Sequence, residues 1–143
     1  MTAKRPSVRL KAPKVVRAPR GWRVRLGRLS HRLGHRSEWL AAALLMLKGY
    51  QILGFRLKTR AGEIDLLARR GRTLAVVEVK RRSTMDQALA ALGPDQYARL
   101  LAAGRAVLRQ RPSLAGHLLR IDIVALAPRR FPRHRRDVNR GRA

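Results

Sequence analysis

The stretch from Gly62 to Lys80 constrains the fold of this chain more than any other part of it. It consists of two apolar runs, residues 62–68 and 74–80, separated by the basic turn Arg69-Arg70-Gly71-Arg72. Short apolar runs bounded by turn residues are typical of β-strands. A connection this short permits only an antiparallel hairpin. The sequence therefore predicts two paired strands around which the domain is organised.

Charged side chains recur at every second position of these two strands. Because side chains alternate between the faces of a strand, Glu63 and Asp65 are expected on one face of the first strand, and Glu78 and Lys80 on one face of the second. The core-facing positions are then Ile64, Leu66, Val77 and Val79. Neighbouring carboxylates repel each other and lose water, so they need a cation between them. Hard oxygen ligands suit Mg²⁺ or Mn²⁺, which predicts a metal site of the kind that cleaves phosphodiester bonds.

The alternative interpretation is a solvated polar face. In that case Glu78 and Lys80 form an exposed pair, while Glu63 and Asp65 balance the surrounding arginines. The distribution of acidic residues favours the metal site, because three of the eight in the chain fall in this one segment.

The same segment resembles the YraN family of small bacterial proteins, whose hallmark is a Gly-Glu-Ile-Asp-Leu run followed by Val-Glu-Val-Lys. These motifs stand here at residues 62–66 and 77–80. The family is similar to the PD-(D/E)xK nuclease superfamily, which includes Holliday-junction resolvases and type II restriction enzymes. The likeness covers residues 37–127 and implies a restriction-endonuclease-like α/β sandwich.

The resemblance also implies roles for individual residues. Asp65 would be the metal-binding aspartate of the first strand, and Glu78 and Lys80 the Glu-x-Lys pair of the second. Glu38 would be the acid on the preceding helix, although an acid in a first helical turn also complements the helix dipole. Glu63 is a further candidate metal ligand, and Gln96 is a candidate to support the site from a later helix. Asp95 and Tyr97 depart from the more basic residues of the family on that helix.

The net charge of +26 favours a polyanionic partner. Arginine greatly outnumbers lysine, and its planar fork suits bidentate phosphate contacts. Charge does not distinguish DNA from RNA, but the resemblance to DNA nucleases implies DNA as the partner, ahead of RNA. The basic residues expected to bind its backbone are Arg56, Lys58, Arg60, Arg81 and Arg82. No segment approaches the roughly 18 apolar residues that span a bilayer, and no cysteine is present. A cytoplasmic protein without stable membrane insertion is expected.

Three parts are expected along the chain: a disordered basic arm at residues 1–36, a nuclease-like domain at 37–127 and a basic C-terminal tail at 128–143. An arginine-rich start also resembles a transit peptide. Within the domain we expect helices at 37–48 and 94–110 and strands at 50–60, 62–68, 74–80 and 118–127. The first three strands form an antiparallel meander, and the last is parallel after a crossover helix, giving a mixed sheet. Arg120 and Asp122 are interpreted as an ion pair, and His31 and His134 as bystanders.

The leading functional hypothesis is an Mg²⁺- or Mn²⁺-dependent endonuclease that acts on DNA, including branched DNA. A second is a non-catalytic DNA- or RNA-binding module that retains the nuclease fold. A third is a protein held electrostatically at a membrane surface. A homodimer stays open, because junction resolvases with this fold pair two sites.

Overall fold

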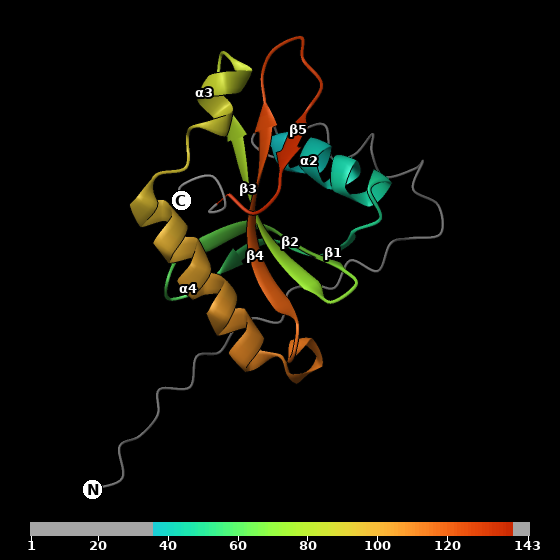
Figure 1. The fold of residues 1–143 in the computed structure, drawn as a ribbon, viewed down its shortest axis with the longest axis vertical. Coiled ribbons are helices and arrows are strands. Elements are labelled where there is room, and N and C mark those ends of the chain that lie inside the picture. Colours follow the sequence, from blue (N-terminus) through green and yellow to red (C-terminus); the bar gives the residue numbers. More distant parts are fainter. Residues whose placement is uncertain (1–35, 139–143) are drawn as a thin grey trace, which may run out of the picture.

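The structure is a computed structural model that describes residues 36–138, and these fold around one five-stranded sheet (Figure 1). The strands, in their order across the sheet, are β1 (Gln51–Lys58), β2 (Glu63–Arg70), β3 (Thr73–Arg81), β4 (Leu118–Leu126) and β5 (Arg133–Arg135). The first three pair antiparallel, β4 lies parallel to β3, and β5 lies antiparallel to β4. The predicted α/β class is confirmed, as is the mixed sheet with an antiparallel start. Residues 1–35 of the arm expected at 1–36 lie outside the described residues, and so does His31, whereas Arg36 begins the first described helix.

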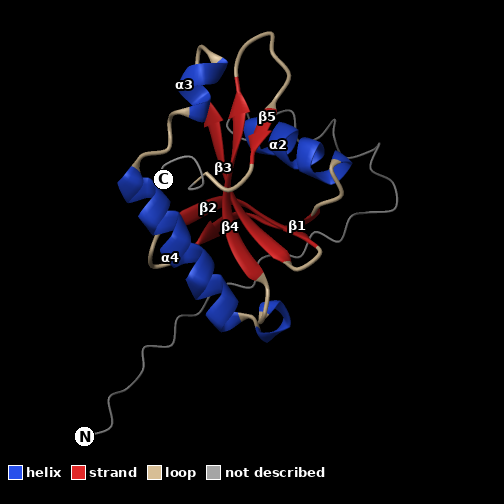
Figure 2. Cartoon of the chain, viewed as in Figure 1, coloured by secondary structure: helices blue, strands red, loops and turns tan. Residues whose placement is uncertain are grey.

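Helices flank the sheet on both faces (Figure 2). They are α2 (Arg36–Leu47), α3 (Met85–Leu89) and α4 (Pro94–Gln110), and a 3₁₀ turn, η1 (Pro112–Leu114), follows α4. Pro94 suits the first position of α4 because its missing N–H has no partner there. The buried stripe of α4 packs closely on the sheet at Gly104, where an added Cβ would lie 2.7 Å from Leu119 Cδ1. The crossover through α4 is what lets β4 run parallel to β3.

The helix α2 buries less of its surface than its composition predicts. Its sequence is apolar almost all round, but only Ala41, Ala42 and Leu45 are buried. Leu40 is 53% exposed and Leu47 is 87% exposed. The other apolar side chains stay exposed because a sheet face covers only one stripe of the helix that lies on it.

Strand β1 is shorter than expected, and the turn that joins it to β2 is longer. Thr59 Oγ1 accepts hydrogen bonds from the backbone N–H groups of Ala61 and Gly62, and Thr59 N donates to Gly62 O at 2.9 Å. These bonds end β1 at Lys58. Arg60 consequently lies in the turn, and not on the strand where the sequence analysis placed it.

Strand β5 was not predicted from the sequence. It forms at Arg133–Arg135, within the region expected to be a tail, and pairs with residues 123–125 of β4. Three residues between arginines and prolines carry too little period-two signal to predict a strand. The pairing partner supplies the missing information, because β4 would otherwise present an unpaired edge.

Candidate active site

Strands β2 and β3 stop pairing through their backbones at the end where Asp65 and Glu78 lie. Backbone pairing between β2 and β3 runs from Arg70 opposite Thr73 to Leu66 opposite Val77 and stops there. Beyond it, Asp65 Oδ2 accepts a hydrogen bond of 2.9 Å from Val79 N. The Asp65 carboxylate thus takes the place of a strand carbonyl and is directed at β3.

This local change also alters the faces of β2. Ile64 packs in the core cluster on the α4 side, whereas Leu66 packs in the cluster on the α2 side with Val77 and Val79. The expectation that Ile64 and Leu66 share one face was therefore wrong. Simple alternation fails at Asp65, where a side chain replaces the backbone as the partner of the next strand.

Glu78, Lys80 and Gln96 form one hydrogen-bonded group on the α4 side of the sheet. Gln96, in the first turn of α4, donates through Nε2 to Glu78 Oε1 at 2.8 Å. Its Oε1 accepts from Lys80 Nζ at 3.0 Å, and Lys80 Nζ also lies 3.2 Å from Glu78 Oε1. The amide of Gln96 therefore links the acid to the ammonium, and fixes both side chains at the start of α4.

Asp65 and Glu78 form a carboxyl pair. The two side chains lie close enough for each to shift the pKa of the other. Burial, assisted by the charge of Asp65, raises the pKa of Glu78 to about 7. Burial likewise raises the pKa of Asp65, and the charge of Glu38 adds to it, although the bond from Val79 N acts in the opposite direction. Two carboxyls so close cannot both ionise easily, so near neutral pH the pair retains a proton unless a cation replaces it.

A dependence of stability on pH follows from the raised pKa of Glu78. Its folded-state pKa of about 7 exceeds the ordinary value of 4.5, so the folded state holds the proton more tightly than the unfolded state. Stability from this group is present below pH 4.5 and is lost as the pH rises through about 7. A shift of this size corresponds to at most roughly 3 kcal/mol. We expect urea unfolding in EDTA to show this loss in the wild type.

The matched control is Glu78→Gln, which keeps an acceptor for Gln96 but does not titrate. Relative to it, the wild type should lose stability between pH 4.5 and 7.5, and added Mg²⁺ should reduce that loss at the upper end. Parallel stability curves for the two proteins across this range would contradict the assigned burial and pairing of Glu78.

Glu38 lies near the carboxyl pair but is engaged by an arginine. Arg56 Nε donates to the two carboxylate oxygens of Glu38 at 2.9 and 3.1 Å. Arg56 has a positive φ of 48°, which is strained for a non-glycine residue inside a strand. The sequence analysis assigned Glu38 to the metal and Arg56 to DNA. In the structure they contact each other, close enough to Asp65 for the charge of Glu38 to raise its pKa.

Glu63 lines a cavity of about 250 Å³. Gly62, Gln96, Arg99 and Leu100 line the same cavity. Within residues 36–138, no three acidic, histidine or cysteine side chains gather as a metal-binding group. Neither Glu63 nor Glu38 therefore completes a third protein ligand here. Mg²⁺ is compatible with this donor set, since it is commonly held by one or two carboxylates, waters and substrate phosphates.

Of the other predicted basic residues, four are exposed: Lys58, Arg60, Arg81 and Arg82. Arg81 and Arg82 directly follow Lys80 at the end of β3. Lys58 lies opposite Glu63 in the strand register. Arg99, on α4, is an exposed cation beside the cavity that sequence reasoning did not single out, because nothing in its local sequence distinguishes it from the other arginines of that helix.

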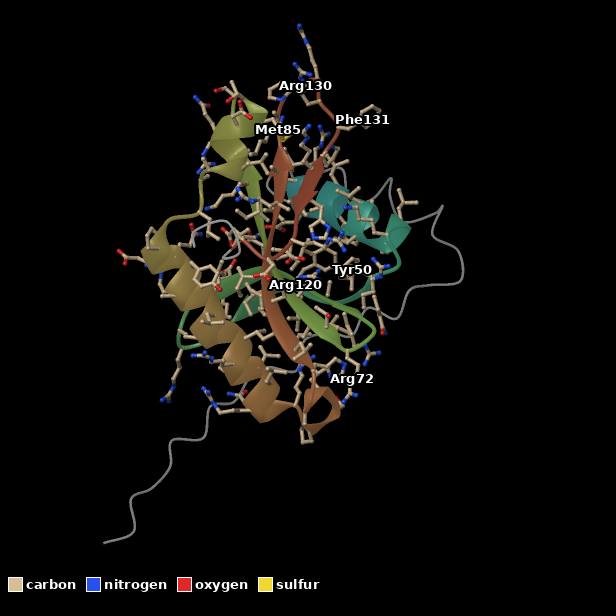
Figure 3. All side chains as sticks on the ribbon, in the orientation of Figure 1. Tyr50, Arg72, Met85, Arg120, Arg130 and Phe131 are labelled. Atoms are coloured by element: carbon tan, nitrogen blue, oxygen red, sulfur yellow. The ribbon has the colours of Figure 1, made fainter. Side chains whose placement is uncertain are left out.

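A second polar cluster occupies the α2 side of the sheet, where Asp122 is completely buried. Arg120 donates to both of its carboxylate oxygens at 2.8 Å, and the backbone N–H of Asp137 donates at 3.0 Å. His134 Nε2 lies 2.8 Å from Asp122 Oδ2, and Arg120 also donates to the hydroxyl of Tyr50. Figure 3 shows Tyr50 and Arg120 together in the middle of the molecule.

The predicted Arg120–Asp122 ion pair is confirmed, and His134, which the sequence did not indicate as a metal ligand, joins that pair. Burial alone would raise the pKa of Asp122. The hydrogen bonds from His134, Arg120 and Asp137 overcome that effect and hold the pKa below its usual value. No local signal could have found His134, because its partner is reached only through the pairing of β5 with β4.

Comparison of the sequence with known proteins identifies a family to which it is similar. The model of "Uncharacterised protein family UPF0102" matches residues 37–126. The chain belongs to UPF0102. A UPF0102 protein of Caulobacter vibrioides is 50% identical over 117 residues, which are 82% of this chain and 94% of that protein. A UPF0102 protein of Parvibaculum lavamentivorans is 51% identical over 121 residues, or 85% and 91% of the two chains.

The expected YraN resemblance is thereby confirmed, since UPF0102 is that family. The region that matches UPF0102 contains Asp65, Glu78, Lys80 and Gln96 and ends with β4, so β5 lies beyond it. In the part of the chain that the structure describes, no helix is both long and apolar enough to cross a bilayer.

Proposed function

We propose that this UPF0102 protein is a divalent-metal-dependent nuclease that hydrolyses phosphodiester bonds in DNA. The observation that carries the proposal is the placing of the Asp65 and Glu78 carboxyls together on neighbouring strands, where burial raises the pKa of both, with Lys80 Nζ 3.2 Å from Glu78 Oε1. Burying two carboxyls together costs stability unless a cation is bound between them. An arrangement of this kind is expected where function, not stability, selects the residues.

Asp65 and Glu78 would hold Mg²⁺ or Mn²⁺, from neighbouring strands. When bound, such an ion polarises the scissile phosphate and lowers the pKa of a coordinated water. Asp65 is oriented for this task by the hydrogen bond from Val79 N. Glu78 is oriented by the hydrogen bond from Gln96, which also accepts a hydrogen bond from the ammonium of Lys80.

Lys80 would supply positive charge beside the reacting phosphate. Its side chain is only 13% exposed, and a charge in such a position acts more strongly than one in water. We assign it to the orientation of the attacking water and to the charge that develops on the phosphate. Arg81 and Arg82, exposed immediately after it, would hold the DNA backbone on either side of the cleaved bond.

A metal titration tests the proposal before any substrate is known. The wild-type protein is expected to bind Mn²⁺ saturably, as measured by calorimetry, and Asp65→Asn should abolish that binding. Asp86→Asn is the matched control, since it removes an equal charge from an exposed position on α3. Branched, linear and single-stranded DNA and RNA are then incubated with the protein and Mg²⁺ or Mn²⁺, and cleavage of DNA is expected.

The second candidate is a binding module without catalysis, and the pairing of Glu38 with Arg56 is the observation that favours it, because it engages one predicted ligand. The titration separates the two. Tight DNA binding with no Mn²⁺ site would establish the binding module. Mn²⁺ binding that persists in Asp65→Asn would show that the assigned ligands are wrong.

A further inference from the structure

The loop between β4 and β5, residues 127–132, carries a fully presented aromatic ring. Phe131 is 92% exposed, the highest exposure among the large hydrophobic side chains of residues 36–138. Figure 3 shows Phe131 and Arg130 beyond the end of the sheet, pointing away from it. Burial of such a ring is strongly favourable in water. Single exposed hydrophobic residues are common, so its backbone, its charge environment and its place in the fold must decide whether it has a role.

The backbone of the loop holds the ring in this position. Arg130 N donates to Ala127 O at 3.3 Å and closes a β-turn whose second residue is Pro128. The third residue of the turn, Arg129, has a φ of 60°, a conformation in which glycine is usual. Pro132 follows the ring and restricts the chain again. Phe131 is therefore presented by a constrained loop, and an arginine occupies a strained position two residues before it.

The surroundings of the ring are strongly positive. Residues 123–136 contain five arginines and no acidic residue. Arg129, Arg130 and Arg133, in and beside the loop, are exposed. Arginines that contact phosphates and an aromatic ring that contacts bases are the combination used to bind nucleic acid with open bases. An aromatic or apolar side chain can also enter a base step and separate the stacked bases.

Strand pairing connects the loop to the strand that carries Glu78 and Lys80. In the parallel register Lys80 lies opposite Ala125, which lies opposite Arg133 in β5, and Arg82 N donates to Leu126 O at 3.1 Å. Phe131 is two residues from Arg133. Two strand spacings and two residues of extended chain place it within roughly 17 Å of Lys80. One DNA strand spans that distance with about five stacked nucleotides, so one molecule can contact both.

We propose that Phe131 stacks on exposed bases of the bound DNA, so that the protein prefers DNA with unpaired bases, such as forks and junctions, over continuous duplex. The proposal rests on the proposed function for the identity of the polyanion and names the substrate class of the same site. Arg129 and Arg130 hold the adjacent phosphates. Bases that are already unpaired meet the ring without the free-energy cost of unstacking a duplex.

Binding measured without divalent ions tests this proposal. Fluorescence anisotropy of the full chain in EDTA compares a forked duplex with a fully paired duplex of equal length and composition. Wild type is expected to bind the fork more tightly. Phe131→Ser should weaken binding to the fork at least fivefold, as expected for loss of one stacked base, and leave the paired duplex within about twofold. Phe131→Trp should retain the preference.

Leu118→Ser is the matched control, because Leu118 is 71% exposed at the opposite end of β4, and it should change neither affinity. Equal affinities for fork and duplex in the wild type, or an equal effect of Phe131→Ser on both, would overturn the proposal. The proposal would also be overturned if Phe131→Ser weakened binding to phosphatidylglycerol vesicles and left fork binding intact. That result would indicate that the ring contacts a membrane surface. The anisotropy assay contains EDTA and no divalent ions, so its result does not depend on a metal site. If the protein proves to have no Mn²⁺ site, the nuclease proposal fails, but this test of Phe131 is unaffected.

Discussion

Asp65→Asn and Glu78→Gln are each expected to lower the rate of DNA cleavage by about a thousandfold or more. Each substitution removes one of the two carboxylates that would hold the ion, and a thousandfold loss corresponds to roughly 4 kcal/mol of transition-state stabilisation. DNA affinity should stay within about twofold, or tighten slightly, because a negative charge is lost from a strongly basic surface. Single-turnover cleavage with Mg²⁺, together with anisotropy titrations, separates the two effects.

Asp86→Asn provides the control for charge, since Asp86 is exposed on α3 and should leave the rate unchanged. If Asp65→Asn and Glu78→Gln cut DNA as fast as Asp86→Asn, the carboxyl pair has no part in catalysis. A loss of cleavage accompanied by an equal loss of DNA binding would instead indicate that the substitutions disturb the binding surface.

Asp122→Ala is expected to destabilise the fold by about 3–5 kcal/mol, the cost of leaving a buried charge without its partner. The substitution would leave the guanidinium of Arg120 without the carboxylate that accepts two of its hydrogen bonds. His134, whose side chain is completely buried, would lose its contact as well. Typical domains have only 5–15 kcal/mol of total stability, so urea unfolding should show a large decrease in the free energy of unfolding.

Two variants sharpen this prediction. Asp122→Asn keeps an acceptor oxygen and a similar shape, and should lose less stability than Asp122→Ala. Asp95→Ala removes an exposed acid from the first turn of α4 and should cost about 1 kcal/mol or less. A loss below 1 kcal/mol for Asp122→Ala would show that the network does not hold β4 and β5 together.

The sequence predicted the features that depend on neighbouring residues. The meander of β1, β2 and β3 follows from apolar runs joined by turns too short for any other connection. Gly49, at the end of the first helix, has a φ of 88°, a conformation typical of glycine in that position. Period-two alternation placed Glu78 and Lys80 on one face, and they lie there together. At Asp65 the same reasoning failed, because a side chain took the place of a backbone partner.

Other features required the assembled sheet. The link from Gln96 to Glu78 and Lys80 joins residues 16 and 18 positions apart, and it exists only because α4 packs across the end of β3. The Lys48–His134 contact, at 3.2 Å, joins residues 86 positions apart. Glu38 pairs with Arg56 because β1 and α2 lie side by side. The local sequence pattern had instead suggested a metal ion as the partner of Glu38 and DNA as the partner of Arg56.

By itself, then, the sequence determined the class of fold, the antiparallel start of the sheet and the strands on which the acidic residues stand. These depend on alternation, turn length and charge, which are all local. Only the tertiary structure decided that Glu63 lies beside a cavity, that His134 closes a buried network and that Phe131 stands at the end of the sheet near Lys80. Each of these depends on which distant strand or helix becomes a neighbour, and that is set by the packing of the whole core.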